Sequence, residues 1–341
     1  MNSLKKLKTK LKKKLFRPKI IVVLGQTASG KSEFAVKLAK KFNPPVGGEI
    51  ISADSRQVYK GLDIGSGKIT KKEMRGIRHH LLNIASPKRI FTVSQYQKLA
   101  KKALKDIIKR GKIPIICGGT GLYIDSIIYG IKFPEVPPNP KLRKKLEKRT
   151  TEELFKQLQK LDPRRAQNID KYNRRRLIRA LEIILITNKP IPNAITNDSK
   201  ISPYNFLKIG IKKSPEELKK LIAKRLKKRI KIGMIKEVKN LRNPPTGGGL
   251  SWQRLDDLGL EYRYVSRFLR QRAQIYADLT LTNAEKKKMV EKIKKEMVDL
   301  ILKESWQYAK RQMTWFKKNG QIRWIKNEKE AYKIIKRFLL N

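Results

Sequence analysis

The chain has 341 residues, 39% of them hydrophobic, which is enough for one large or two ordinary folded domains and excludes an intrinsically disordered protein. It has 83 Lys and Arg against 29 Asp and Glu, a formal net charge of +54 that favours nucleic acid as a partner, although a general bias toward lysine explains part of it. Cys117 is the single cysteine, which excludes an internal disulfide framework and predicts a cytoplasmic location. The sequence contains no apolar run of about 18 residues, so we expect no membrane-spanning helix.

The first part of the chain has the pattern of an α/β fold. Residues 1–18 are a basic extension ended by Pro18, and residues 19–140 then alternate short apolar runs with helical patterns. The apolar runs are 20–24, 49–53 and 113–117, and the helical patterns include 32–42 and 92–110. A small-residue turn follows each apolar run. This alternation of strand, turn and helix predicts a doubly wound parallel sheet. All three turns should lie at the carboxyl ends of its strands and converge on one cleft.

The second part of the chain is mostly helical. Prolines precede residues 141–198, which we expect to form a helical insertion domain. The chain then returns to the core through residues 199–325 and ends in a basic tail, 326–341. The expected elements of this part are a strand at 206–211, helices at 215–232 and within 254–316, a loop at 243–249, a short strand at 321–325 and a tail helix at 328–340.

The sequence GQTASGKS at residues 25–32 fits the phosphate-binding pattern G-x-x-x-x-G-K-[ST]. Glycines let backbone N–H groups surround phosphate oxygens, Lys31 supplies positive charge, and Ser32 can bind Mg²⁺. The alternative is a chance glycine turn, against which the preceding apolar strand and the following helix argue. The pattern indicates a di- or triphosphate without saying which.

Two further residues lie where the sheet should present its ligand site. Asp54 follows the second strand, and we favour a metal ligand or general base over its alternative, a helix N-cap. Thr120 lies in the turn GGTG after the third strand, and an ordinary capping turn is the alternative. The only histidines, His79 and His80, have no cluster of other metal ligands, so we expect structural roles or a substrate contact.

Six motifs taken together resemble the tRNA dimethylallyltransferase (IPP transferase) family. They are GQTASGKS, ISADSRQVYKGLDIGSGK, GIRHHLLNI, IPIICGGTGLYIDSI, RRLIRALEI and KRQMTWFKK, in that order across residues 19–325. The resemblance implies a P-loop NTPase-like core with a helical insertion. It also implies transfer of a dimethylallyl group from dimethylallyl diphosphate to N6 of adenosine 37, beside the tRNA anticodon, with release of diphosphate. The phosphate loop would then hold the leaving group of the donor rather than ATP.

The resemblance also implies roles for individual residues. Asp54 matches the general base, and Thr120 matches a residue at the oxygen that bridges carbon and phosphorus. Mg²⁺ would be the cofactor, held at Ser32. The expected diphosphate ligands are Gly25, Gln26, Thr27, Ala28, Ser29, Gly30, Lys31, Ser32 and Arg311. The expected tRNA contacts are Asp54, Ser55, Arg56, Gln57, Arg143, Arg175, Arg176, Leu177, Ile178, Arg179, Lys310, Arg311, Gln312, Thr314, Trp315 and Lys317. We expect a monomer whose insertion grips the anticodon stem-loop.

Other functions remain open on the sequence. A P-loop kinase of a nucleotide or metabolite shares the loop and the sheet but needs no Arg-rich insertion. An RNA-binding GTPase would need N-K-x-D, whereas Ile191 stands at the last position of NKPI. A prenyltransferase that acts on free AMP is a third alternative, less consistent with the charge. The sequence departs from the family pattern at Gln26, where Pro is common, and aligns only loosely around Gly259 and Tyr262.

Overall fold

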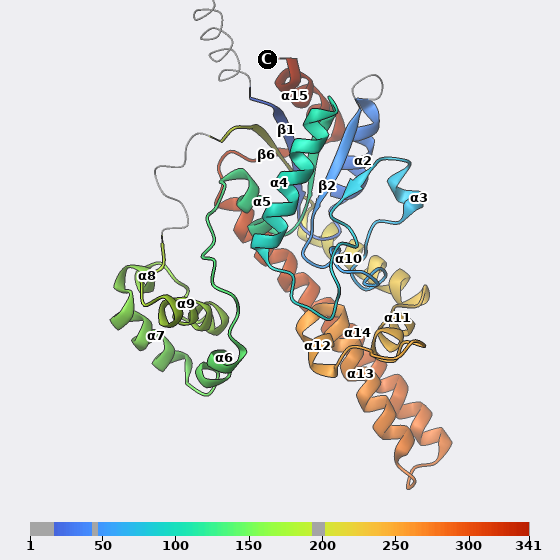
Figure 1. The fold of residues 1–341 in the computed structure, drawn as a ribbon. Helices are drawn as coiled ribbons and strands as arrows, with labels where there is room; N and C mark the ends of the chain where they lie inside the picture. The colour runs from blue at the N-terminus through green and yellow to red at the C-terminus, as the bar shows by residue number, and fades with distance from the viewer. Residues whose placement is uncertain (1–16, 43–46, 193–201, 341) are drawn as a thin grey trace, which may run out of the picture. The chain divides into compact units, whose positions relative to one another are not determined.

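The structure is a computed structural model that describes residues 17–42, 47–192 and 202–340 (Figure 1). The chain divides into two compact units, one formed by Met1–Ile128 with Ser202–Asn341 and the other by Tyr129–Ile201. Nearly all of the predicted basic extension, residues 1–18, lies outside the described residues, as does the polar segment 193–201 that precedes the return to the first unit.

The larger unit is built on one parallel sheet. Its strands are β1 (Lys19–Gly25), β2 (Gly48–Ala53), β3 (His79–His80), β4 (Ile113–Gly118), β5 (Asn205–Ile211) and β6 (Arg323–Ile325), arranged in the order β3-β2-β4-β1-β5-β6. All neighbours pair in parallel. The expected α/β class is confirmed, as are the three strands predicted from apolar runs and the two expected at 206–211 and 321–325. β3 was not predicted, because two histidines give no apolar run.

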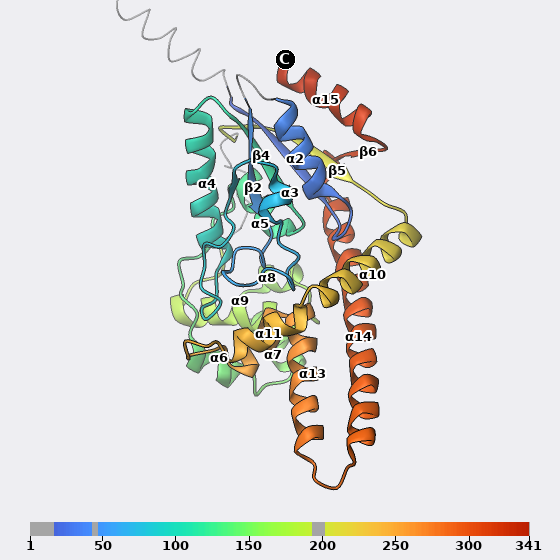
Figure 2. The same ribbon diagram turned by 90° about the vertical axis from the view of Figure 1, so that its right-hand side faces the viewer.

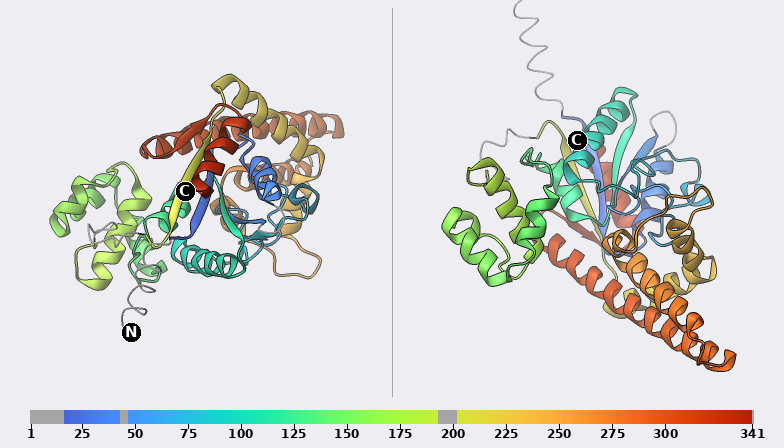
Figure 3. Two further views of the ribbon diagram at one scale, coloured as in Figure 1. Left: turned by 90° about the horizontal axis from the view of Figure 1, so that it is seen from above. Right: turned by 60° about the horizontal axis from the view of Figure 1, so that its bottom comes forward.

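Helices cover both faces of this sheet. Ile20 and Val22 of β1 pack on one face with α4 (Val93–Lys109) and α5 (Gly121–Ile128), while Ile21 and Val23 pack on the other. The second face is covered by α2 (Lys31–Lys41) and α15 (Glu328–Leu340). Figure 3 shows the strands nearly edge-on between these layers. A strand buried on both faces reads as a continuous apolar run, which is why the strands were visible in the sequence.

The tail helix predicted after residue 325 is confirmed as α15, and it belongs to the core of the larger unit. Ala331 and Ile335 are completely buried in the same cluster as β1 and α2, and Glu328 forms an ion pair with Lys37 at 2.9 Å. The basic residues of this helix therefore lie on an amphipathic element with a fixed apolar face.

The rest of the larger unit is helical. Its helices are α3 (Lys71–Met74), α10 (Pro215–Lys231), α11 (Met234–Arg242), α12 (Trp252–Leu258), α13 (Leu260–Ala277) and α14 (Asn283–Lys317). α14 has 35 residues and begins with a capping box between Thr282 and Glu285. It runs antiparallel to α13 and then continues to the sheet, where it contacts β1 and α5 (Figure 2).

The smaller unit is the helical insertion. It contains α6 (Pro140–Leu146), α7 (Thr151–Leu161), α8 (Pro163–Gln167) and α9 (Arg174–Thr187) around an apolar core of its own. Glu182 of α9 is completely buried and accepts hydrogen bonds from Arg143 Nε at 2.8 Å, from Arg179 Nη1 at 2.5 Å and from the Asn139 backbone at 2.7 Å. One buried carboxylate thus fixes two half-exposed guanidinium groups.

Candidate functional site

The three special turns lie at one edge of the sheet. β4 lies between β1 and β2, and Gly118 at its end pairs with Leu24 of β1 and with Ala53 of β2. The three strands therefore end level with one another, and the turns that follow them are neighbours. The Thr120 N–H donates to the Ala53 carbonyl at 3.1 Å, which ties the second and third turns directly. The predicted convergence is confirmed.

The loop at residues 25–32 has the backbone of a phosphate site. Ala28 and Gly30 adopt positive φ angles of 62° and 89°, and α2 begins at Lys31 directly after Gly30. The first N–H groups of a helix have no partner within it and attract anions, as does the helix dipole. Lys31 Nζ donates to the Gln26 carbonyl at 3.0 Å, so its ammonium group folds over the loop.

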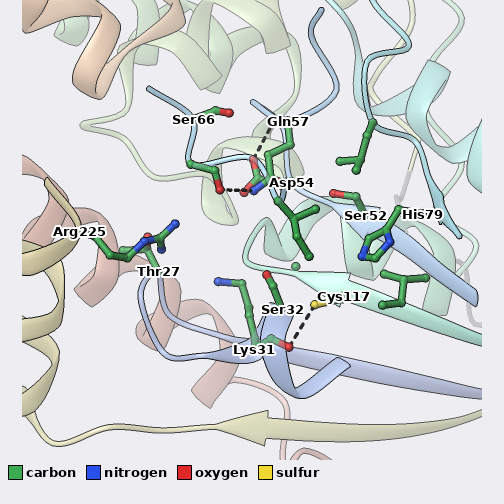
Figure 4. A pocket seen from close by; sticks show the side chains of 15 residues that line it. Thr27, Lys31, Ser32, Ser52, Asp54, Gln57, Ser66, His79, Cys117 and Arg225 are labelled. Carbon is green, nitrogen blue, oxygen red and sulfur yellow. Dashed lines mark hydrogen bonds between the residues drawn. The ribbon is translucent and has the colours of Figure 1, made fainter. Parts of the chain in front are cut away.

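A pocket that is partly open to solvent lies over this loop (Figure 4). Its lining residues are Thr27, Lys31, Ser32, Ile50, Ser52, Asp54, Gln57, Ser66, Gly67, Ile69, His79, Leu82, Cys117, Gly118 and Arg225. Three of them, Ile50, Ile69 and Leu82, are aliphatic. The pocket therefore offers both positive charge and an apolar surface.

Two cations dominate the electrostatics of the pocket. Lys31 and Arg225 both line it, and Figure 4 shows their side chains pointing toward the same space, with Asp54 across it. Burial lowers the pKa of Lys31 and also that of Arg225. No carboxylate of the described residues lies within ion-pair distance of either. Removing cations from water without a paired anion is costly, so the pocket is suited to an anionic ligand.

Asp54 is held by its own turn. Its Oδ1 accepts from the N–H of Arg56 at 2.8 Å and of Gln57 at 3.3 Å, and no other hydrogen bond to this carboxylate comes from the part of the chain that the structure describes. The local contacts expected of a cap are present, yet the group also lines the pocket and keeps Oδ2 for a substrate. Thr120 Oγ1 accepts from the Ser55 N–H at 3.1 Å, which places the hydroxyl beside Asp54.

The other predicted site residues are distributed unevenly. Of the predicted diphosphate ligands, Thr27, Lys31 and Ser32 line the pocket, whereas Arg311 is exposed on α14 and is not among the lining residues. Arg175 and Arg176 are exposed on α9, as are Lys310, Thr314 and Lys317 on α14. Three predicted RNA contacts are buried instead: Leu177, Ile178 and Gln312 are 0%, 7% and 6% exposed. Trp315 is half-buried and donates to Asp125 at 2.7 Å.

Sequence reasoning missed Arg225. The segment KRLKKRIK around it contains so many cations that none stands out. The signal was its position next to Leu226, since Leu218, Ile222 and Leu226 form the buried stripe of α10.

The two histidines have different surroundings. His79 was given no definite role in the sequence analysis, and it lines the pocket, where burial lowers its pKa. His80 instead hydrogen-bonds Glu49 at 2.7 Å.

Within the described residues, no group of three or more His, Cys, Asp or Glu side chains is arranged to hold a metal ion. Mg²⁺ commonly takes one or two protein ligands and fills its other positions with phosphate oxygens and water. The Ser32 hydroxyl at the edge of the pocket fits that pattern.

In the same described ranges, no helix is both long and apolar enough to cross a membrane.

A parallel sheet with a phosphate loop after its first strand, a cationic pocket over that loop and a carboxylate at the next strand end is the architecture of a P-loop protein. Residues 57–319 match the family model described as IPP transferase. The tRNA dimethylallyltransferase of Anoxybacillus flavithermus is 40% identical over 307 residues, 90% of each chain. The tRNA dimethylallyltransferase 2 of Treponema denticola is 41% identical over 313 residues, 89% of this chain and 95% of that one.

Solved structures agree with these relatives. The tRNA isopentenylpyrophosphate transferase of Bacillus halodurans superposes with a TM-score of 0.62 at 31% identity, covering 95% of this chain and 96% of that one. A eukaryotic dimethylallyltransferase described as acting on tRNA superposes with a TM-score of 0.70 at 27% identity, covering 90% and 73%. The chain therefore belongs to the IPP transferase family and is, by this homology, an enzyme of the tRNA dimethylallyltransferase class.

Proposed function

We propose that this enzyme transfers a dimethylallyl group from dimethylallyl diphosphate to the N6 amine of adenosine 37 in tRNA, releasing diphosphate. The observation that carries the proposal is the pocket in which Lys31 and Arg225, both desolvated and without an anionic partner among the described residues, lie over a phosphate loop. A diphosphate leaving group supplies the missing negative charge. The aliphatic side chains of Ile50, Ile69 and Leu82 suit a five-carbon chain better than a nucleoside.

The same residues support a mechanism. The adenine N6 attacks C1 of the prenyl group while the C1–O bond to diphosphate breaks, and the departing electron pair stays on the diphosphate. Lys31, Arg225 and the loop amides stabilise that growing charge. Asp54, its Oδ1 already held by two backbone amides, takes the proton from N6 through Oδ2. The Thr120 hydroxyl, fixed beside Asp54, is our candidate contact for the bridging oxygen.

Mg²⁺ is the cofactor we propose, held by Ser32 and by the diphosphate of the donor. When bound, it neutralises charge on the leaving diphosphate. The remaining predicted loop residues, Gly25 through Gly30, contribute backbone amides, although two of these N–H groups already donate within the protein: Thr27 to Gln312 at 2.8 Å and Ser29 to the Gln26 carbonyl at 3.3 Å. Arg311 is exposed outside the pocket lining, and we assign it to RNA rather than to the diphosphate.

We propose two RNA-binding surfaces, one in each unit. The surface in the helical insertion consists of the exposed Arg175 and Arg176 together with Arg143 and Arg179, which Glu182 orients. The surface on α14 consists of the exposed Lys310, Arg311, Thr314 and Lys317. Arginines fixed by a buried carboxylate lose less conformational entropy when they bind a phosphate than free side chains do.

We propose that the enzyme acts as a monomer in the cytoplasm, where tRNA is found.

Substitutions in the pocket test the function. Lys31→Met and Arg225→Met should each lower kcat/KM for dimethylallyl diphosphate by about 10²-fold, because each removes a charge from the leaving group. Lys40→Met on α2 and Lys228→Met on α10 are matched controls, because both lysines are exposed. If the pocket variants and the controls transfer the prenyl group at the same rate, the diphosphate does not bind here and the proposal is wrong.

A further inference from the structure

Gln312 connects two parts of the site that are far apart in the sequence. Its side-chain oxygen accepts a hydrogen bond from the Thr27 N–H in the phosphate loop at 2.8 Å. Its side-chain nitrogen donates to the Gly119 carbonyl, in the turn after β4, at 2.8 Å. A single amide group on α14 therefore spans the diphosphate loop and the turn that carries Thr120.

The helix holds the phosphate loop at a second point. Gln26 Nε2 donates to the backbone carbonyl of Ala309, three residues before Gln312, at 3.0 Å. Gln26 and Gln312 are both about 6% exposed, so water does not compete for these hydrogen bonds. The departure from the family pattern at Gln26 thus supplies an extra anchor between the loop and α14.

The approach of α14 to the turn after β4 is close. A Cβ atom at Gly119 would overlap the side-chain nitrogen of Gln312, and one at Gly121 would overlap the ring of Trp315. The Tyr308 side chain, four residues before Gln312, lies beside that of Thr120. Residues 308, 312 and 315 share one helix face, and that face is packed on the turn.

The same positions argue against an RNA contact by Gln312. Its neighbours Lys310, Arg311 and Thr314 are exposed and lie on another side of α14, whereas Gln312 is buried with both ends of its amide occupied. Glutamine fits because the site needs one acceptor and one donor on a rigid planar group. Methionine has a similar length and supplies neither a comparable acceptor nor a donor.

We propose that Gln312 is a positioning residue that sets the distance between the diphosphate loop and the turn bearing Thr120, instead of contacting tRNA. This role rests on the proposed prenyl transfer, in which the leaving diphosphate and the attacking N6 must lie in line. Loss of the bridge lets the two loops separate, and a misplacement of about 1 Å in such a site lowers the rate by about 10²-fold.

The test compares Gln312→Met with wild-type enzyme in steady-state kinetics and in equilibrium binding of unmodified tRNA. We expect kcat/KM for dimethylallyl diphosphate to fall by about 10²-fold, while the tRNA Kd stays within about twofold. Lys310→Met, on the exposed face, should show the opposite pattern and raise the tRNA Kd. A variant that binds tRNA more weakly but retains wild-type donor kinetics would overturn the positioning role and make Gln312 an RNA contact.

Gly119→Ala provides a second, independent variant, because its methyl group displaces the Gln312 amide without removing it. If the bridge matters, combining it with Gln312→Met should cost less than the product of the two single effects, since both break one interaction. Fully multiplicative effects would contradict the bridge. Prenyl transfer by the wild-type enzyme separately tests the proposed function, so that failure of the two ideas can be told apart.

Discussion

Glu237 on α11 holds the loop that closes one side of the pocket. Its carboxylate accepts hydrogen bonds from three successive backbone N–H groups and one hydroxyl. The donors are Asp63 at 3.0 Å, Ile64 at 2.6 Å, Gly65 at 2.9 Å and the Tyr262 hydroxyl at 3.0 Å. The loop continues into Ser66 and Gly67, which line the pocket. Removing this carboxylate should therefore affect both stability and donor binding.

The size of the effect follows from the donors left without partners. In Glu237→Gln the new NH₂ group can replace the oxygen that faces Tyr262, whose hydroxyl turns to accept from it, so that of the three backbone donors only the Gly65 N–H loses its partner. One lost hydrogen bond to a charged group costs about 1.5–3 kcal/mol, and we take about 1.5 because the loop is partly exposed. Glu237→Ala leaves all four donors unpaired and should cost about 4 kcal/mol.

Urea denaturation followed by circular dichroism measures the free energy of unfolding for both variants. Glu296→Gln is the matched control, because Glu296 is an exposed glutamate on α14. We expect the order Glu237→Ala, Glu237→Gln, Glu296→Gln from least to most stable, with a raised KM for dimethylallyl diphosphate in the first two. If Glu237→Ala and the control unfold at the same urea concentration, the loop does not depend on this carboxylate and the reasoning is wrong.

Three further predictions concern buried groups. Burial raises the pKa of Glu49, but its arginine and histidine partners lower it to about 2. Its stabilisation is therefore complete above about pH 4.5 and lost as the pH falls toward 2, so Glu49→Gln should flatten an acid-denaturation curve over that range; an unchanged curve would contradict this. Burial raises the pKa of Cys117 to about 11. Alkylation by iodoacetamide at pH 8, followed by mass spectrometry, should be about 100-fold slower in folded protein than in urea, and equal rates would contradict the burial. Glu182→Gln should destabilise the protein by about 3 kcal/mol in urea and weaken tRNA binding, since two guanidinium groups lose their anion; a loss below about 1 kcal/mol would argue against that role.

The parts of the fold that came from the sequence are those where local pattern and tertiary environment agree. The strands at 20–24, 49–53 and 113–117 are continuous apolar runs because both faces of the sheet are covered. The phosphate site was visible for a different reason: its loop has a positive φ angle at Gly30, which favours glycine. β3 was missed because His79 and His80 carry no apolar signal and pair with β2 only through tertiary contact.

The site was predicted less completely, since sequence motifs do not show which way a side chain faces. Gln312 and Leu177 stand inside motifs of the family, yet the first bridges two loops and the second lies in the core of the insertion. Arg225 was hidden among other cations of α10. Glu237 lies far in sequence from the backbone groups that it holds, and Glu182 lies far from Arg143 although only three residues from Arg179, so no local pattern reveals the buried networks that they form.

The most direct test of the central claim is the product formed when the enzyme is incubated with dimethylallyl diphosphate, Mg²⁺ and unmodified tRNA, then analysed by nucleoside mass spectrometry. Asp54→Asn is measured beside the wild type, because it retains the shape of the side chain but not the base. The account predicts dimethylallyl-adenosine from the wild type and a loss of about 10²–10⁴-fold in rate for the variant. No prenylated nucleoside, with ATP hydrolysed in its place, would contradict the account and support a kinase.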